Sequence, residues 1–377
     1  MAEIQTQKKA RRSYASWEHQ RSQRKVQLPE GPVDVNELNQ WPHLLFKNMT
    51  QSGHKAEDNQ MMARLHSNLQ QGLDMALDYG GICDREALRC AILGYTQSVD
   101  WNFGDHQPLQ VVRTCDRNSA IGEMCTEYAK SQKPQPCHFK DIMDRIPSYQ
   151  RSWIESVWCG NGAKFDRRVE ALEAIKTYIE SNSSSMFAHG ATAVCSVHAK
   201  SCPVCPLAYH DLQSDTKTLA ATDPGARRLQ MVSAGVTCTA FSKEGLQRKE
   251  TDESMIYHEI WMAERKVRTV AKYEDLVWVE CTPRYPMDRL PTERMGEHMK
   301  FVSITDGPEL HGRPQKRMRA LGCGINQFTY RWCGPDTDED IAMDYARRFH
   351  RGVVLDGSDF FFQTDVERHI EYGHQAM

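Results

Sequence analysis

Short apolar runs alternate with longer segments of helical periodicity along most of the chain. Apolar runs of strand length occupy residues 73–79, 109–115, 136–142, 229–235 and 274–280. Segments with the spacing of helices lie between them, at 54–73, 84–93, 119–130 and 254–267. Further strand candidates at 297–304 and 318–325 precede a last predicted helix at 339–350. Strands that alternate with helices predict an α/β fold with a mostly parallel sheet.

This alternation stops between residues 145 and 225. An amphipathic helix is predicted at 169–181, and the serine-rich stretch SNSSS at 181–185 is typical of a linker. Residues 193–210 are rich in Cys and His. We interpret this part as a helical and Cys-rich insertion. The chain then divides into a basic, disordered arm at 1–54, an α/β half at 55–144, the insertion at 145–225, a second half at 226–330 and a C-terminal remnant at 331–377.

The composition is that of an ordinary globular protein and excludes few classes. The 377 residues carry 47 Lys and Arg against 50 Asp and Glu, which excludes a uniformly basic histone-like protein. The sequence contains no run of 18 apolar residues, so no membrane span is predicted. The N-terminus lacks the apolar core of a secretory signal. The 13 cysteines therefore predict reduced thiols in an intracellular protein. The run KKARR at 8–12 is a solvated tail, a phosphate contact or a nuclear localisation signal.

Three motifs in the second half carry candidate chemistry. In SAGVTCTAFSKEG a strand ends in Ala-Gly, Cys238 follows, and Phe-Ser and Gly come after it. Glu280 ends another strand 42 residues after Cys238. Gln315 follows 35 residues later, with Arg317 and Arg319 in alternation. This order resembles the cytosine-5 DNA methyltransferases, in which a Pro-Cys loop with Phe-Ser, a Glu-Asn-Val strand end and a Gln-x-Arg-x-Arg motif follow one another.

The resemblance implies a role for each matching residue. Cys238 is implied as the nucleophile that adds to C6 of cytosine, after the base has left the duplex. Glu280 is implied to hold or share a proton at N3 and the exocyclic amine. Arg317 and Arg319 are implied to position the reacting groups, and an alternating pair on a strand would place both guanidinium groups on one face. The implied enzyme is a DNA (cytosine-5-)-methyltransferase, with RNA as the less favoured substrate.

The sequence also departs from the family's pattern. Thr237 replaces the proline before the cysteine, so the loop lacks a residue that fixes φ. Thr239 replaces the glutamine after the cysteine, and Cys281 and Thr282 replace the Asn-Val that follows the glutamate. These losses weaken the prediction of catalytic turnover more than the prediction of the fold. The alternative is a catalytically inactive, methyltransferase-like protein that binds nucleic acid.

The same resemblance implies an S-adenosylmethionine site in the first half, on a Rossmann-like methyltransferase domain. Asp116, after the second strand, takes the place of the family's ribose-binding acid. Asp141, in FKDI after the third strand, takes the place of the adenine contact. Gly80 and Gly81 correspond to the glycine-rich turn after the first strand, although most of that motif is lost.

The insertion holds a possible metal site. His198, Cys202, Cys205 and His210 offer two thiols at CxxC spacing and two imidazoles, with Cys195 nearby, and such a set suits tetrahedral zinc. The spacing is tight for four ligands, because zinc modules usually separate two pairs by about a dozen residues. The alternative is a reduced, Cys-rich loop. A third interpretation of the whole chain makes this cluster a zinc-binding interaction module on an inert scaffold.

The C-terminal part limits the expected specificity. In the family a variable target-recognition region and a final motif follow Gln-x-Arg-x-Arg, whereas 58 residues follow Arg319 in this sequence. We therefore expect a reduced target-recognition region, with sequence readout by another element or a partner. The implied partner is DNA, the implied location is the nucleus, and no membrane is involved.

Overall fold

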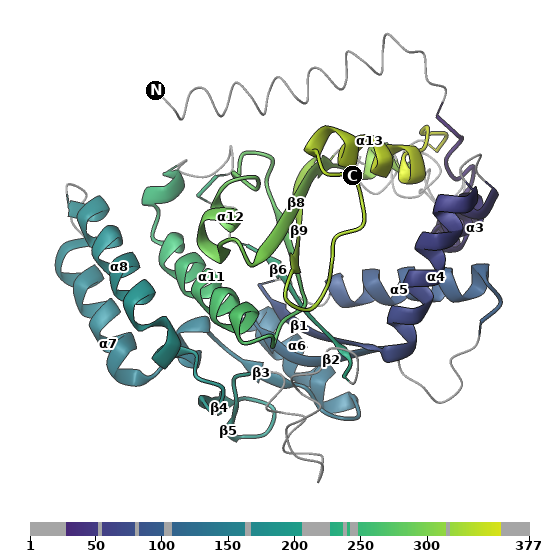
Figure 1. Cartoon of the computed structure of the whole chain (residues 1–377). Helices are drawn as coiled ribbons and strands as arrows, with labels where there is room; N and C mark the ends of the chain where they lie inside the picture. Colours follow the sequence, from purple (N-terminus) through teal and green to yellow (C-terminus); the bar gives the residue numbers. More distant parts are fainter. Residues whose placement is uncertain are drawn as a thin grey trace, which may run out of the picture.

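The structure is a computed structural model that describes residues 28–51, 55–79, 83–101, 108–162, 167–205, 227–236, 240–241, 248–313 and 317–355. Within these ranges no helix has the length and apolarity needed to cross a membrane. One seven-stranded sheet runs through the middle of the molecule, with helices on both of its faces (Figure 1).

The seven strands form a mostly parallel sheet, as predicted. Its members are β1 (Leu73–Asp78), β2 (Leu109–Cys115), β3 (Cys137–Phe139), β6 (Leu229–Gly235), β7 (Leu276–Cys281), β8 (Met299–Asp306) and β9 (Arg319–Asn326). The order across the sheet is β3-β2-β1-β6-β7-β9-β8. The first five strands are parallel, and β9 runs antiparallel to both β7 and β8. The direction of strand addition reverses between β1 and β6, which is the topological switch point of a doubly wound, Rossmann-like fold.

Alternation along the strands gives the sheet two different apolar faces. Ala76 of β1 pairs with Val232 of β6, which pairs with Val277 of β7, and all three belong to the main core. Met75 and Leu77 belong to a second core that includes Leu88 of α5 (Cys83–Ser98). The buried strands predicted from apolar runs are therefore covered on both sides.

Helix α11 (Ser254–Val270) lies in the main core beside the sheet. It packs against α8 (Arg168–Met186) and α12 (Leu290–Met295), and α7 (Ser148–Val157) packs against α8 (Figure 1). A second small sheet, a hairpin of β4 (Thr192–Cys195) and β5 (Lys200–Pro203), lies beside β3. Helices α7 and α8 and the hairpin fall between β3 and β6 in the sequence, where the helical and Cys-rich insertion was predicted.

The serine-rich stretch at 181–185 is helical, so its interpretation as a linker is wrong. It forms the last turns of α8, where Ser183 and Ser185 donate hydrogen bonds to the carbonyl oxygens of Glu180 and Asn182. Met186, at the end of the helix, is completely buried in the main core. Burial at the end of the helix therefore outweighs the weak helix preference of serine.

Part of the range predicted to be a disordered N-terminal arm is helical. Helices α2 (Val35–Asn39) and α3 (Trp41–Gln51) lie inside the range 1–54, and residues 1–27 lie outside the described part of the chain. Met49 of α3 packs in a small core with Met62 of α4 (Lys55–Gln71) and Tyr95 of α5. The apolar residues of α3 thus bury against their neighbours instead of remaining in a solvated arm.

The segment after β9 packs against the N-terminal helices. It contains α13 (Asp338–Phe349), and Arg348 of this helix makes a buried ion pair with Asp58 of α4. The residues that follow α13 form bridges to two earlier segments, at Glu30 and at His311. Both ends of the described chain are therefore tied to the same side of the domain.

Candidate functional site

The carboxyl ends of the five parallel strands meet at one edge of the sheet. Open α/β sheets bind ligands at this edge, close to the topological switch point. Three candidate residues from the sequence lie at these strand ends, namely Asp116 after β2, Asp141 after β3 and Glu280 in β7. This edge therefore carries the candidate chemistry.

Glu280 forms an ion pair across two strands at this edge. Arg319, the first residue of β9, donates from Nε to Glu280 Oε1 over 2.8 Å. Both side chains are partly open to solvent, at 34% for Glu280 and 27% for Arg319. A carboxylate held by a guanidinium group at an accessible strand end is placed to contact a ligand, whereas a buried structural pair is not.

The end of β6 lies directly beside this ion pair. Gly235 of β6 pairs with Glu280, and the Cys281 thiol contacts the Val236 carbonyl oxygen at 3.7 Å. Cys238 comes three positions after Gly235 but lies outside the described residues, as does Gln315. Of the predicted catalytic residues the structure thus brings together Glu280 and Arg319.

Arg317 does not share a strand with Arg319. The strand β9 begins at Arg319, and Arg317 precedes it as an exposed residue whose backbone N–H donates to Glu309 at 3.4 Å. The expectation that strand alternation places both guanidinium groups on one face therefore loses its premise, because Arg317 is not part of β9. The glycine and proline in the preceding GRP sequence favour a turn over an extended strand at this point.

The two carboxylates predicted to hold the cofactor lie at neighbouring strand ends. Cys115 of β2 pairs with Phe139 of β3, so Asp116 and Asp141 leave the sheet at the same edge. Asp116 Oδ1 accepts a hydrogen bond from the Asn118 amide at 2.8 Å, and Asp141 accepts one from the Met143 amide. Both carboxylates are fixed by the backbone while remaining partly accessible.

A cation of the chain itself lies beside Asp141. Arg117 Nε is 3.5 Å from Asp141 Oδ2, and Arg117 Nη1 donates to the hydroxyl of Tyr257, on α11, over 2.7 Å. The Arg117 side chain is 63% exposed, whereas that of Asp141 is 21% exposed. Arg117 therefore places an exposed positive charge beside Asp141 at this edge.

Under the same edge lies a buried network of charges that the sequence motifs did not indicate. Asp78, the last residue of β1, accepts hydrogen bonds from Arg113, Arg145 and Arg265 at 3.0 to 3.2 Å and from the Trp261 indole at 3.0 Å. All of these side chains are essentially inaccessible. Burial alone would raise the pKa of Asp78, but the three guanidinium groups hold it below its usual value.

The network joins the elements that surround the candidate site. Arg113 belongs to β2, Arg145 to the 3₁₀ helix η1 (Ile142–Arg145) that follows Asp141, and Glu264 and Arg265 to α11. Glu264 pairs with all three arginines and with Arg268, and Glu274 pairs with Arg265 at 2.7 Å. The ends of β1 and β3 are thus fixed to α11 by charges that have no access to water. Gly80 and Gly81, which follow β1, lie outside the described residues.

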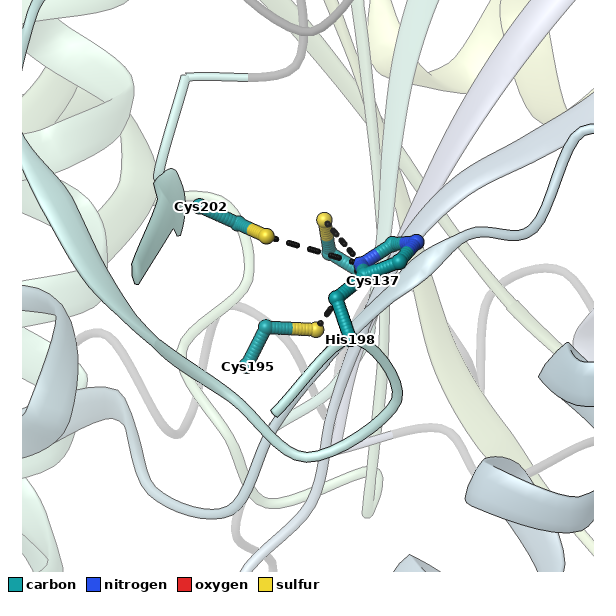
Figure 2. A group of neighbouring side chains, drawn as sticks. All are labelled: Cys137, Cys195, His198 and Cys202. Carbon is teal, nitrogen blue, oxygen red and sulfur yellow. Dashed lines mark hydrogen bonds between the residues drawn. The ribbon is translucent and has the colours of Figure 1, made fainter. Parts of the chain in front are cut away.

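A Cys and His group next to the site differs from the predicted one. His198 and Cys202 lie together, but their partners are Cys195, at the end of β4, and Cys137, at the start of β3 (Figure 2). The potential ligand atoms of these four residues lie within 4.8 Å of one another. Cys205 is buried against Tyr273 and is not part of the group, and His210 lies outside the described residues. The assignment of Cys205 to this group is therefore wrong.

Of the two ligands that replace the predicted ones, Cys195 was noted beside the sequence-based set, whereas Cys137 was missed. Cys137 comes 58 residues before Cys195, on a strand of the main sheet, so no local spacing connects it to the Cys-rich hairpin. The contact between Arg117 and Tyr257 was missed for the same reason, because the two residues are far apart in the sequence and only the fold brings them together. The one available signal was the position of Cys137 at the start of a short strand next to Asp141.

Comparison with known proteins gives a distant likeness in fold. No protein-family model matches the chain, and no curated protein matches it. The solved structures that resemble it in fold include the following three. A variant of Spodoptera frugiperda DNMT2 has a TM-score of 0.35 and 9% identity, and covers 71% of this chain and 54% of that one. The S. pombe Dnmt2 methyltransferase has a TM-score of 0.33 and 12% identity, and the match covers 69% of this chain and 53% of that one. A putative DNA modification methyltransferase encoded within an E. coli prophage has a TM-score of 0.34 and 11% identity, and the match covers 71% of this chain and 50% of that one.

The chain spans about half the length of the solved proteins that it resembles. At these identities and TM-scores the likeness says nothing about activity or substrate. The strand order and strand directions define the fold as a Rossmann-like α/β domain with a mostly parallel sheet, and function rests on the residues of the chain.

Proposed function

We propose that this chain is an S-adenosylmethionine-dependent cytosine-5 methyltransferase that acts on DNA. The observation that carries the proposal is the Glu280–Arg319 ion pair, which lies at the carboxyl edge of the sheet beside the end of β6. The segment that follows β6 holds Cys238, and Asp116 and Asp141 follow neighbouring strands at the same edge. A nucleophile, a carboxyl group and two cofactor-binding acids in this arrangement match the needs of the reaction.

In the proposed reaction Cys238 and Glu280 act on opposite sides of one ring. The Cys238 thiolate adds to C6 of cytosine and forms an S–C6 bond, which makes C5 nucleophilic. Glu280 donates a proton toward N3, where charge develops, and Arg319 holds the Glu280 carboxyl in place. S-adenosylmethionine, when bound, supplies the methyl group that C5 takes up. Loss of the C5 proton to solvent, return of the N3 proton to Glu280 and departure of the Cys238 thiolate then restore the aromatic ring.

The residues at the cofactor edge fit S-adenosylmethionine. Asp116 is anchored by Oδ1, which accepts a hydrogen bond from the Asn118 backbone amide. A fixed carboxylate at the end of the second strand suits the hydroxyl groups of a ribose. Asp141 is partly exposed at the end of the next strand, where it suits an amino group. These acids bind and orient, and no step of bond making depends on them.

One observation favours the alternative, a nucleic-acid-binding protein without turnover. Asp141 already faces Arg117, which is in turn bonded to Tyr257. An amino group of the cofactor competes with this cation for the same carboxylate, and an exposed arginine at the edge suits a phosphate of the nucleic acid instead. The alternative therefore predicts DNA binding without measurable affinity for S-adenosylmethionine.

Two measurements on the full chain test the proposal. We expect transfer of a tritiated methyl group from S-adenosylmethionine to cytosine-containing DNA, and we expect calorimetric binding of the cofactor in the absence of DNA. Cys238→Ser should abolish transfer and retain cofactor binding, whereas Cys90→Ser, which changes an exposed cysteine, should retain both. Cofactor binding without transfer to DNA or RNA would contradict the enzyme assignment. DNA binding with neither cofactor binding nor transfer would establish the alternative.

A further inference from the structure

Four potential metal ligands converge from two segments that are far apart in the sequence. Cys137 begins β3 in the main sheet, whereas Cys195, His198 and Cys202 belong to the β4–β5 hairpin and its turn (Figure 2). The three thiol groups point toward His198 Nδ1 from different directions. We propose that Cys137, Cys195, His198 and Cys202 bind one structural Zn²⁺ ion that fastens the hairpin to the edge of the main sheet.

The distances between the donor atoms agree with a tetrahedral zinc site. His198 Nδ1 lies 3.3 Å from Cys195 Sγ, 3.5 Å from Cys202 Sγ and 3.7 Å from Cys137 Sγ. Zinc–sulfur bonds of about 2.3 Å and zinc–nitrogen bonds of about 2.0–2.1 Å at tetrahedral angles place sulfur and nitrogen about 3.6 Å apart. The three observed nitrogen–sulfur separations bracket this value, and all four donor atoms lie within 4.8 Å of one another, as the ligands of a single ion would.

The chemistry of the donors selects zinc over other common ions. Three thiolates and one imidazole are soft and borderline ligands, which exclude Mg²⁺ and Ca²⁺ and suit Zn²⁺. Four protein ligands leave no open position on a tetrahedral ion, and a closed site of this kind is structural and not catalytic. The three cysteines are buried, with exposed fractions of 4% or less, so the ion would be shielded from solvent.

The backbone around the group is arranged as it is in compact metal-binding turns. The His138 amide donates to Cys195 Sγ over 3.4 Å, and the Ser196 amide donates to the His138 carbonyl oxygen over 2.9 Å. Ala199 takes a positive φ of 51°, which allows the chain to reverse between His198 and Lys200. Amide-to-sulfur hydrogen bonds stabilise thiolate ligands, so this second layer supports a metal site.

The position of the site gives it a mechanical role. The hairpin has two strands of four residues each, and an isolated two-stranded hairpin of this size is at best marginally stable. β3 is itself only three residues long and lies at the edge of the main sheet. An ion bound by both elements would hold each in place, as metal binding is commonly coupled to folding in small elements.

A second His and carboxylate group is a poorer candidate. Asp306 lies 2.6 Å from His311 Nε2, which is a direct hydrogen bond, and Tyr345 donates to the same carboxylate oxygen. Metal ligands around one ion do not bond to each other at such a distance. The Asp306 group is therefore explained by its own hydrogen bonds, whereas in the thiol-rich group three sulfur atoms share the single ring nitrogen His198 Nδ1, which offers only one hydrogen-bonding position.

Metal analysis of the purified full chain tests the zinc site independently of any methyltransferase activity. We expect one zinc ion per chain by inductively coupled plasma mass spectrometry. Replacement of zinc by Co²⁺ should give thiolate-to-cobalt charge-transfer bands together with the visible absorption bands of a tetrahedral Co²⁺ ion. The Co²⁺ spectrum uses the unmodified chain, so it does not depend on the folding of a variant. Chains without bound zinc that also give no Co²⁺ bands would overturn the proposal.

Variants distinguish this ligand set from the one that local spacing indicated. Cys137→Ser and Cys202→Ser should each lose most of the zinc, whereas Cys205→Ala and His210→Ala should retain one ion per chain. Cys90→Ser, in an exposed position on α5, is the matched control for cysteine removal. Zinc that is retained in Cys137→Ser, or lost in His210→Ala, would contradict the assignment.

Discussion

Replacement of Asp78 by asparagine tests whether the buried charge network holds the candidate site together. Asp78→Asn keeps the size of the side chain but removes the negative charge that faces Arg113, Arg145 and Arg265 at 3.0 to 3.2 Å. Four buried arginines would then face two acids instead of three. Removal of one partner from a buried ion pair costs about 3–5 kcal/mol, because it leaves an uncompensated charge without water. We expect a loss of that size in the free energy of unfolding.

Urea unfolding at neutral pH, followed by circular dichroism, measures this loss. The matched control is Asp144→Asn, which removes a carboxylate whose pair with Arg151 is 34% and 39% exposed. Exposed pairs contribute about 0–1 kcal/mol, so the control should unfold close to the unmodified protein. A loss below about 1 kcal/mol for Asp78→Asn would refute the reasoning that these charges depend on one another.

Three further predictions concern the edge of the sheet and the core behind it. Glu280→Gln should slow methyl transfer by roughly a hundredfold or more, as expected for loss of a proton donor, while the exposed pair with Arg319 makes the cost in stability at most about 1 kcal/mol; normal transfer would contradict the role. Asp116→Ala should weaken S-adenosylmethionine binding about tenfold, which calorimetry measures, and unchanged affinity would remove Asp116 from the site. Burial and nearby Arg294 lower the pKa of His258 from 6.5 to about 3, so the unfolded chain binds a proton that the folded chain excludes. The unfolding free energy should therefore fall by about 1.4 kcal/mol per pH unit on acidification from about pH 6.5 toward pH 3, and His258→Gln should remove that contribution from the slope; an equal slope would contradict it.

The order of strands and helices was predictable because it rests on local patterns. The run at 229–235 and the helix predicted at 254–267 match β6 and α11 within a few residues, since buried strands and amphipathic helices have distinct periodicities. The pairing of β9 between β7 and β8 could not be read from the sequence, because strand order depends on contacts between distant segments. The prediction of a linker at the serine-rich end of α8 failed for a related reason, because burial of Met186 at this end outweighs the weak helix preference of the serines.

The candidate site was predictable only where strand ends carry it. Glu280 and Asp116 follow apolar runs, and parallel strands bring their carboxyl ends to one edge, so their placement followed from the fold. Cys137 and Arg117 have no local signature and take their roles from neighbours far away in the sequence. The buried group around Asp78 was also not predicted, because single charged residues within apolar runs give no sign of their partners.

The measurement that tests the central claim most directly is covalent trapping on DNA that contains 5-fluorocytosine. In the proposed reaction fluorine at C5 cannot leave as a proton does, so the S–C6 bond to Cys238 persists after methyl transfer. We predict an adduct that survives denaturation, requires S-adenosylmethionine, is absent in Cys238→Ser and is retained in Cys90→Ser. An adduct that persists in Cys238→Ser, or no adduct under conditions where both DNA and S-adenosylmethionine bind, would contradict the account.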